Sequence, residues 1–113
     1  MANKSAPMLS VGGYESAITA AGSSISDAAS LSGAVNIITT AAASSGVKLP
    51  DLGGPMCVVA VVNKGANTVN VYPPSSSGSI NGGSAGAAVT IATNKAAVFF
   101  STGTGTWLHV AGA

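Results

Sequence analysis

The stretch Met56–Tyr72, MCVVAVVNKGANTVNVY, decides the fold class of this chain. Its first part, Cys57–Val62, is a run of β-branched and small apolar residues that is too short for a helix, and such a run is typical of a strand buried on both faces. Its last part, Thr68–Tyr72, alternates valine with polar side chains, as a half-buried strand does. The intervening segment, Asn63–Asn67, contains Asn and Gly, which tolerate the positive φ of a tight reversal. The stretch therefore predicts a β-hairpin.

Short strand patterns flank this hairpin on both sides. Each is apolar or alternating and is bounded by Gly, Pro, Asn or Ser, as strands of small β domains are; they are Asn36–Thr40, Val47–Leu49, Ser79–Asn81, Ala87–Ala92, Ala96–Ser101 and Trp107–Val110. Two regions are less decided. Tyr14–Ala21 suits either one or two helical turns or a short strand, and Asp27 suits the cap of a short helix.

We therefore expect a mainly β fold, a small antiparallel β-sandwich or barrel-like domain formed by residues 14–113. Residues 1–13 are expected to form an irregular N-terminal arm, because proline and glycine break any periodicity there. The arm has two interpretations, a floppy tail or a segment that becomes ordered on a partner. The strand-and-turn rhythm also suggests a solenoid, but the sequence shows no fixed period of the kind that solenoids have.

The chain is poor in charge and in large side chains. Charged residues make up 6% of its 113 residues and aromatic residues 4%, with a net charge of +1. The lysines are scattered, so no basic footprint for nucleic acid or for an anionic membrane surface is present. Small side chains offset the ordering entropy of a lone domain badly. We therefore expect part of the stability to come from association with other subunits, which would also cover sheet edges.

The single cysteine, Cys57, excludes an intrachain disulfide, and its place in an apolar strand favours a buried reduced thiol. The N-terminal sequence MANKSAPMLS lacks the apolar core of a signal peptide. The strongest apolar run, Met56–Val62, is far shorter than the roughly 20 residues that a membrane span takes. Folding in a reducing cytoplasm, without membrane insertion, is the expectation.

Catalytic and metal-binding motifs are weak throughout the sequence. Gly82–Gly86, GGSAG, matches the G-x-S-x-G pattern of a hydrolase, but that motif needs a preceding strand, a following helix and acidic and histidine partners, and no Asp or Glu follows Asp51. His109 is the only histidine, and with Cys57 it cannot supply the four ligands of a structural zinc site. We expect no catalytic residue, no metal and no cofactor.

Aromatic side chains are the candidate interface residues: Tyr14, Tyr72 and Trp107. When exposed, Tyr72 and Trp107 suit stacking on glycans or anchoring of an interface; when buried, they fill a core that is short of bulk. Both interpretations stay open at this point. Phe99 and Phe100 are expected in the core.

The second half of the chain resembles small virion proteins of tailed bacteriophages. The similarity covers VVNKGANTVNVYPPSSSGSINGG (Val61–Gly83) and AAVTIATNKAAVFFSTGTGTWLHV (Ala87–Val110). In those proteins a strand ends in Val-Asn-(Lys/Arg)-Gly, an Asn-Val-Tyr-Pro strand and an Ile-Asn-Gly turn follow, and a closing strand carries Trp. The first half matches only in texture, at Ile18–Ser24 and Thr39–Pro50.

The resemblance implies a non-enzymatic virion component, and for a free-standing domain of this size a capsid decoration, or cement, protein. Such a protein is made in the host bacterial cytoplasm and binds the outer head surface as an oligomer, commonly a trimer, where it bridges subunits of the major capsid protein. The alternative is a tail, fibre or baseplate module that contacts host glycans. Neither function requires nucleic acid or a membrane as a partner.

Overall fold

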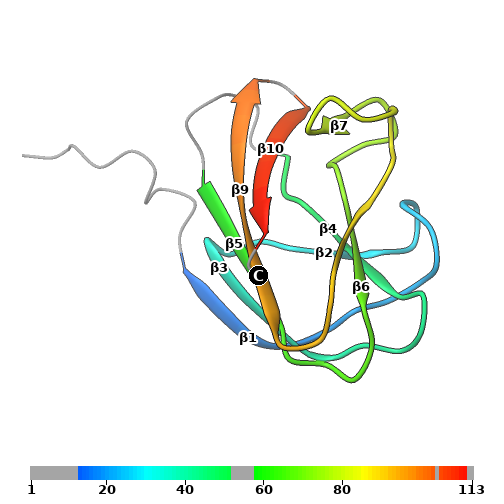
Figure 1. Cartoon of the computed structure of the whole chain (residues 1–113), viewed down its shortest axis with the longest axis vertical. Helices are drawn as coiled ribbons and strands as arrows, with labels where there is room; N and C mark the ends of the chain where they lie inside the picture. The colour runs from blue at the N-terminus through cyan, green and yellow to red at the C-terminus, as the bar shows by residue number, and fades with distance from the viewer. Residues whose placement is uncertain (1–12, 52–57, 104, 112–113) are drawn as a thin grey trace, which may run out of the picture.

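The computed structural model describes residues 13–51, 58–103 and 105–111 (Figure 1). Within these residues the chain forms ten strands and no helix, so the expectation of a mainly β fold is confirmed. In chain order the strands are β1 (Tyr14–Thr19), β2 (Ala29–Ser30), β3 (Val35–Thr40), β4 (Gly46–Lys48), β5 (Val58–Asn63), β6 (Val69–Tyr72), β7 (Ser79–Ile80), β8 (Val89–Ile91), β9 (Lys95–Gly103) and β10 (Thr106–Ala111).

The strands form two sheets that the chain visits in alternation. The six-stranded sheet has the order β1-β3-β5-β9-β10-β7, and the four-stranded sheet has the order β2-β4-β6-β8. Up to β6 each strand lies parallel to the strand two positions earlier in the chain, β3 on β1, β4 on β2, β5 on β3 and β6 on β4. This winding makes successive coils stacked on one another, a solenoid-like arrangement.

The solenoid-like arrangement corrects the prediction of an antiparallel sandwich or barrel. The solenoid-like arrangement is not visible in the sequence because successive coils differ in length. Tyr14 pairs with Val35, and Val35 pairs with Ala60, so equivalent positions in the six-stranded sheet are 21 and then 25 residues apart. In the four-stranded sheet Ala29 pairs with Val47 and Val47 with Val71, which gives 18 and then 24 residues. The sequence therefore lacks the fixed period by which solenoids are identified.

The predicted hairpin is also corrected, although both of its strands exist. β5 lies in the six-stranded sheet and β6 in the four-stranded sheet, so the two do not pair. The turn between them crosses from one sheet to the other, and none of its residues has a positive φ. Asn63 organises this crossing: its amide accepts a hydrogen bond from the Gly65 N–H at 2.9 Å and donates to the carbonyls of Asn67 and Ile91.

The C-terminal part of the chain closes each sheet with antiparallel pairs. β9 pairs with β5 and then with β10, while β8 pairs with β6. The strands predicted at Ser79–Asn81, Ala87–Ala92, Ala96–Ser101 and Trp107–Val110 are therefore confirmed, with small shifts of their ends. β7 adds to β10 as a short parallel edge strand.

One core lies between the two sheets and is built mostly of valine and isoleucine. Its fully buried members include Ile38, Val59 and Phe99 from the six-stranded sheet and Val47, Val69 and Val71 from the four-stranded sheet. Two asparagines, Asn36 and Asn63, are buried among them, and both have hydrogen-bond partners. No buried side-chain nitrogen or oxygen of the described residues lacks a partner, as a stable interior requires.

The undecided N-terminal segments are now placed. Tyr14–Thr19 is a strand rather than a helical turn. Asp27 caps no helix; its Oδ1 accepts hydrogen bonds from the backbone N–H groups of Ser23 and Ser24 and thereby shapes a turn. Most of the predicted arm, residues 1–12, lies outside the described residues, as does Cys57.

Candidate functional site

The feature of this fold that most calls for a functional explanation is the outer face of the six-stranded sheet. Strands alternate their side chains between two sides, and on this sheet the side away from the core is also apolar. We call these outward side chains the outer apolar face; they are Tyr14, Val35, Ile37, Thr39, Val58, Ala60, Val62, Ala96, Val98, Phe100, Thr102, Thr106, Leu108 and Val110. Eleven of them are apolar, three are threonines, and none is charged.

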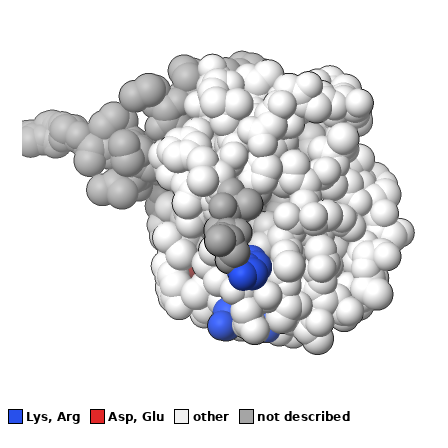
Figure 2. All heavy atoms as spheres, viewed as in Figure 1, with Lys and Arg blue, Asp and Glu red and all other residues white. Residues whose placement is uncertain are grey.

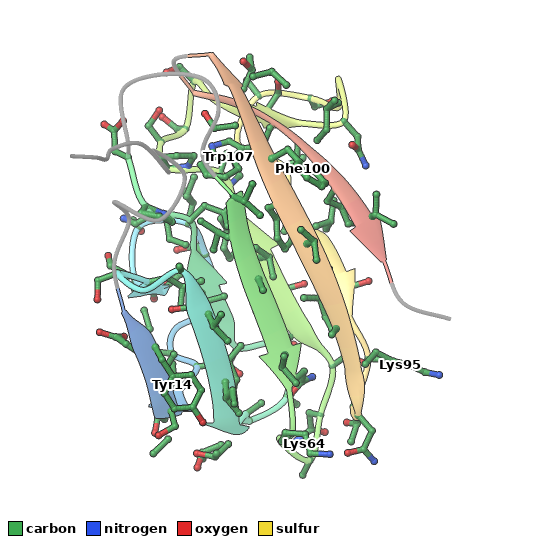
Figure 3. All side chains as sticks on the ribbon, turned by 90° about the vertical axis from the view of Figure 1, so that its left-hand side faces the viewer. Tyr14, Lys64, Lys95, Phe100 and Trp107 are labelled. Carbon is green, nitrogen blue, oxygen red and sulfur yellow. The ribbon has the colours of Figure 1, made fainter. Side chains whose placement is uncertain are left out.

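The strand register brings these side chains into continuous rows across the sheet. One row runs through directly paired residues on all five main strands: Tyr14, Val35, Ala60, Val98 and Val110. Directly opposed side chains on one face lie about 5 Å apart and contact each other. Residues separated by nearly a hundred positions in the sequence thus become one surface, which Figure 3 shows from the front.

A second row runs beside the first, through Val58, Phe100 and Leu108. Several members of the two rows are markedly open to solvent. The exposed fraction is 65% for Val110, 64% for Tyr14, 51% for Leu108, 40% for Phe100 and 38% for Val35. Single exposed apolar residues are ordinary, but a contiguous apolar patch on a sheet is a mark of an interaction surface.

The local reason for this exposure is that β9 and β10 carry large side chains on both sides. Trp107 and His109 point into the molecule, where His109 stacks on Phe99 with ring centroids 5.3 Å apart. Asn81 holds this strand in place, since its N–H donates to the Trp107 carbonyl and its Oδ1 accepts from the His109 N–H. Because Trp107 and His109 point inward and side chains alternate along a strand, Leu108 and Val110 lie on the outer apolar face.

Among the described residues, no charged side chain belongs to the outer apolar face. Lys64 and Lys95 lie together at one end of the sheet, where β5 ends and β9 begins (Figure 3). In the view of Figure 1, Figure 2 shows blue lysine atoms gathered near the lower end of a surface that is otherwise nearly uncharged. The face itself therefore offers apolar area, while long-range charge acts only at its end.

The opposite face of the molecule, the outer side of the four-stranded sheet, is different in kind. Its outward positions are Ser30, Lys48, Asn70, Tyr72 and Thr90, which are largely polar. Antiparallel and mixed sheets of soluble domains commonly show such a polar side to water. The contrast between the two faces makes the six-stranded sheet the candidate interaction surface.

The three predicted interface residues fall in three different places. Tyr14 lies on the outer apolar face, at the first strand of its main row. Tyr72 lies on the polar face of the other sheet, half-buried, with its ring close against the backbone of Gly46. Trp107 is in the core, with 2% of its surface exposed, so the core-filling interpretation holds for it in this structure.

Other members of the face were not predicted, and one prediction nearby was wrong. Phe99 is fully buried as expected, but Phe100 is 40% exposed, because neighbours along a strand face opposite sides. The sequence signal for this face is that odd and even positions of one strand are both apolar, as in Val58–Val62 and Ala96–Phe100. In Cys57–Val62 this pattern predicts burial on both faces, and the structure shows only one side of Val58–Val62 in the core.

The residues of the chance hydrolase motif and the sole histidine do not form a catalytic group. Ser84 is exposed in the connection between β7 and β8, and no helix follows it. The Nδ1 of His109 is hydrogen-bonded to the Asn81 amide. Among the described residues no group of three or more His, Cys, Asp and Glu side chains is arranged to hold a metal ion.

The acidic side chains serve local structure. The Oδ1 of Asp27 accepts the Ser24 hydroxyl hydrogen bond as well as backbone hydrogen bonds from Ser24 and Ser23, and these bonds lower the pKa of Asp27 below its ordinary value. Glu15 accepts a hydrogen bond from the hydroxyl of Ser32, which ties β1 to the connection before β3.

Comparison with known proteins finds no matching family model, no matching curated protein and no matching solved structure. In the described part of the chain there is also no helix of the length and apolar character that a membrane crossing takes. The fold and the face thus define a charge-poor, solenoid-like β protein with one apolar outer sheet face.

Proposed function

We propose that this chain is a non-enzymatic structural protein of a virion, of the capsid decoration or cement type. The observation that carries the proposal is the outer apolar face: a sheet surface of mostly apolar side chains, none of them charged, several of which are open to solvent. Assembly proteins work by complementary surface and need no reacting group. The resemblance of Val61–Val110 to small virion proteins of tailed bacteriophages points to the same class.

In this role the protein binds the outer surface of the head as an oligomer and bridges neighbouring subunits of the major capsid protein. Its affinity derives from buried apolar area and from backbone hydrogen bonds at sheet edges. Because only 6% of the residues of the chain are charged, binding to the head is expected to depend weakly on salt.

The experiment that tests the proposal is quantitative mass spectrometry of purified virions whose heads and tails have been separated. The expected result is recovery with the heads, at a copy number comparable to that of the major capsid protein. Recovery with the tails at low copy number would replace the proposal with a fibre or baseplate role. Absence from both fractions would overturn the assignment to a virion.

The tail or fibre alternative, with contact to host glycans, rests on Tyr72. Its half-buried ring lies on the outer side of the four-stranded sheet, in register with Lys48 on the neighbouring strand. A tyrosine ring beside polar side chains is a common platform for a sugar. Trp107, the other aromatic considered for this role, is buried and offers no such platform.

A further inference from the structure

We propose that the outer apolar face is the contact between copies of this chain, and that it builds the oligomer before any other partner binds. The proposed function requires an oligomer but does not say which surface holds its copies together. The contact can be tested with the purified chain alone. Three properties of the face support a second copy as its occupant.

The first property is composition. Eleven of the fourteen outward residues are apolar and none is charged. Interfaces between proteins that also exist separately are about as polar as the remaining surface, whereas interfaces between permanent copies resemble a protein core that has been cut in half. The face repeats the valine, isoleucine and phenylalanine composition of the core behind it, so it matches the second kind.

The second property is size. Strands lie about 4.8 Å apart and rise about 3.3 Å per residue, so five strands of about six residues present roughly 500 Å² in projection. Side-chain relief makes the accessible area larger than this projection, and a stable complex typically buries ~800 Å² per partner. An apolar sheet surface of equal extent covers such a face fully, and a copy of the same sheet supplies one.

The third property is self-compatibility. A surface that meets its own copy must avoid placing like charges together, since such pairs cost several kcal/mol. The rows through Val98 and Phe100 hold no charge, and the nearest lysines, Lys64 and Lys95, lie at one end of the sheet. Packed sheets align their strands within about 30°, and a two-fold axis perpendicular to the strands places the lysine ends of the two copies at opposite ends of the contact.

The test is the molar mass of the full chain in solution, by light scattering and sedimentation, for the wild type and two matched lysine variants. Leu108→Lys places a charge on the outer apolar face at a side chain that is 51% exposed, so the isolated fold tolerates it. Thr90→Lys places the same charge on an exposed position of the polar face and serves as the control. If Leu108→Lys does not fold, Val110→Lys, at 65% exposure, replaces it.

We expect the wild type and Thr90→Lys to form a dimer at both low and high salt, and Leu108→Lys to be a folded monomer. The lysine should weaken association about 100-fold or more, because it buries a charge without a partner. A wild type that stays monomeric at high concentration, or two variants that associate equally well, overturns the inference. A failure to find the protein in virions leaves this result untouched, so the two proposals fail separately.

Discussion

The side-chain amide of Asn63, at the end of β5, donates a buried 2.9 Å hydrogen bond to the carbonyl oxygen of Ile91, in β8. The two residues belong to different sheets, so this bond ties the six-stranded sheet to the four-stranded one. The same amide also bonds Gly65 and Asn67 within the turn. A single polar side chain thus directs the chain from one sheet to the other.

Replacement of Asn63 by alanine should destabilise the protein strongly. Three hydrogen bonds are lost, and buried backbone groups of Ile91 and Gly65 are left without partners. Each such group costs about 1–3 kcal/mol, so we expect a loss of roughly 3 kcal/mol or more from the free energy of unfolding, measured by urea denaturation. Asn70→Ala, which removes one exposed bond to Ser44, is the control and should cost less than about 1 kcal/mol. Equal losses would contradict the role of Asn63.

Replacement of Gly65 by alanine should also destabilise the fold, through a clash between adjacent coils. A Cβ at this position would lie 2.7 Å from the Cβ and 2.9 Å from the N of Ala41. Overpacking of this kind typically costs about 1–3 kcal/mol. The measurement is the midpoint of thermal or urea unfolding.

A double-mutant cycle with Ala41→Gly identifies the clash that the Gly65→Ala prediction invokes. Removal of the Ala41 Cβ takes away the nearest of the two contacting atoms. The double variant should recover part of the stability that Gly65→Ala loses, and the backbone contact should retain the rest. Strict additivity of the two changes would show that the coils do not approach each other at this point.

The fluorescence of Trp107 should report a buried indole. It is the only tryptophan in the chain and is 2% exposed, so its emission should be blue-shifted and resistant to acrylamide quenching. Saccharides should leave the emission unchanged, because the ring has no free surface on which a sugar can stack. Emission typical of a hydrated indole, or a saturable change on addition of glycans, would show that Trp107 is accessible after all.

Truncation of Trp107 to alanine tests its contribution to the core. Loss of a buried tryptophan side chain typically costs about 3–5 kcal/mol. Leu108→Ala, one residue along the same strand but half exposed, should cost much less in the free energy of unfolding of the monomer. A similar cost for both would contradict the inward and outward assignment of β10.

Acid should weaken the turn that Asp27 organises. Because hydrogen bonds from Ser24 and Ser23 hold the pKa of Asp27 below its ordinary value, its carboxylate stabilises the fold at pH values above the unfolded pKa. This contribution is lost as the pH falls below about 4 and through the lower pKa of the folded protein. Urea unfolding against pH should therefore show a slope at acid pH that Asp27→Asn reduces. An identical pH dependence in that variant would exclude Asp27 as the source.

How far the fold was predictable is clearest from β5 and β6. The alternation of Thr68–Tyr72 and the apolar run before it correctly predicted two strands, because burial against one core demands those side-chain patterns. The Asn- and Gly-containing segment between them predicts a hairpin, because such a segment suits a tight reversal. The same segment also suits a crossing between two sheets, which is what the structure has. What decides between these outcomes is the contact of Gly65 and Asn67 with Ala41 in the previous coil, more than twenty residues away.

The candidate interaction face shows the same division. Most of its residues are apolar, and Tyr14 is the one member that the sequence analysis names as an interface candidate. A strand whose odd and even positions are both apolar does not reveal which of its two sides faces the core. Only the sheet order shows that the inner side meets the four-stranded sheet while the outer side meets none of the described elements.

By itself the sequence determined the strand content, the scarcity of charge and the weakness of every catalytic motif, because these depend on side-chain chemistry and on spacing over a few residues. The tertiary structure decided the parallel coiling, the burial of Trp107 and the assembly of Tyr14, Val98 and Val110 into one surface. The physical reason is that strand pairing is a long-range choice: backbone hydrogen bonds form equally well with many partners, and only packing across the whole core selects one of them.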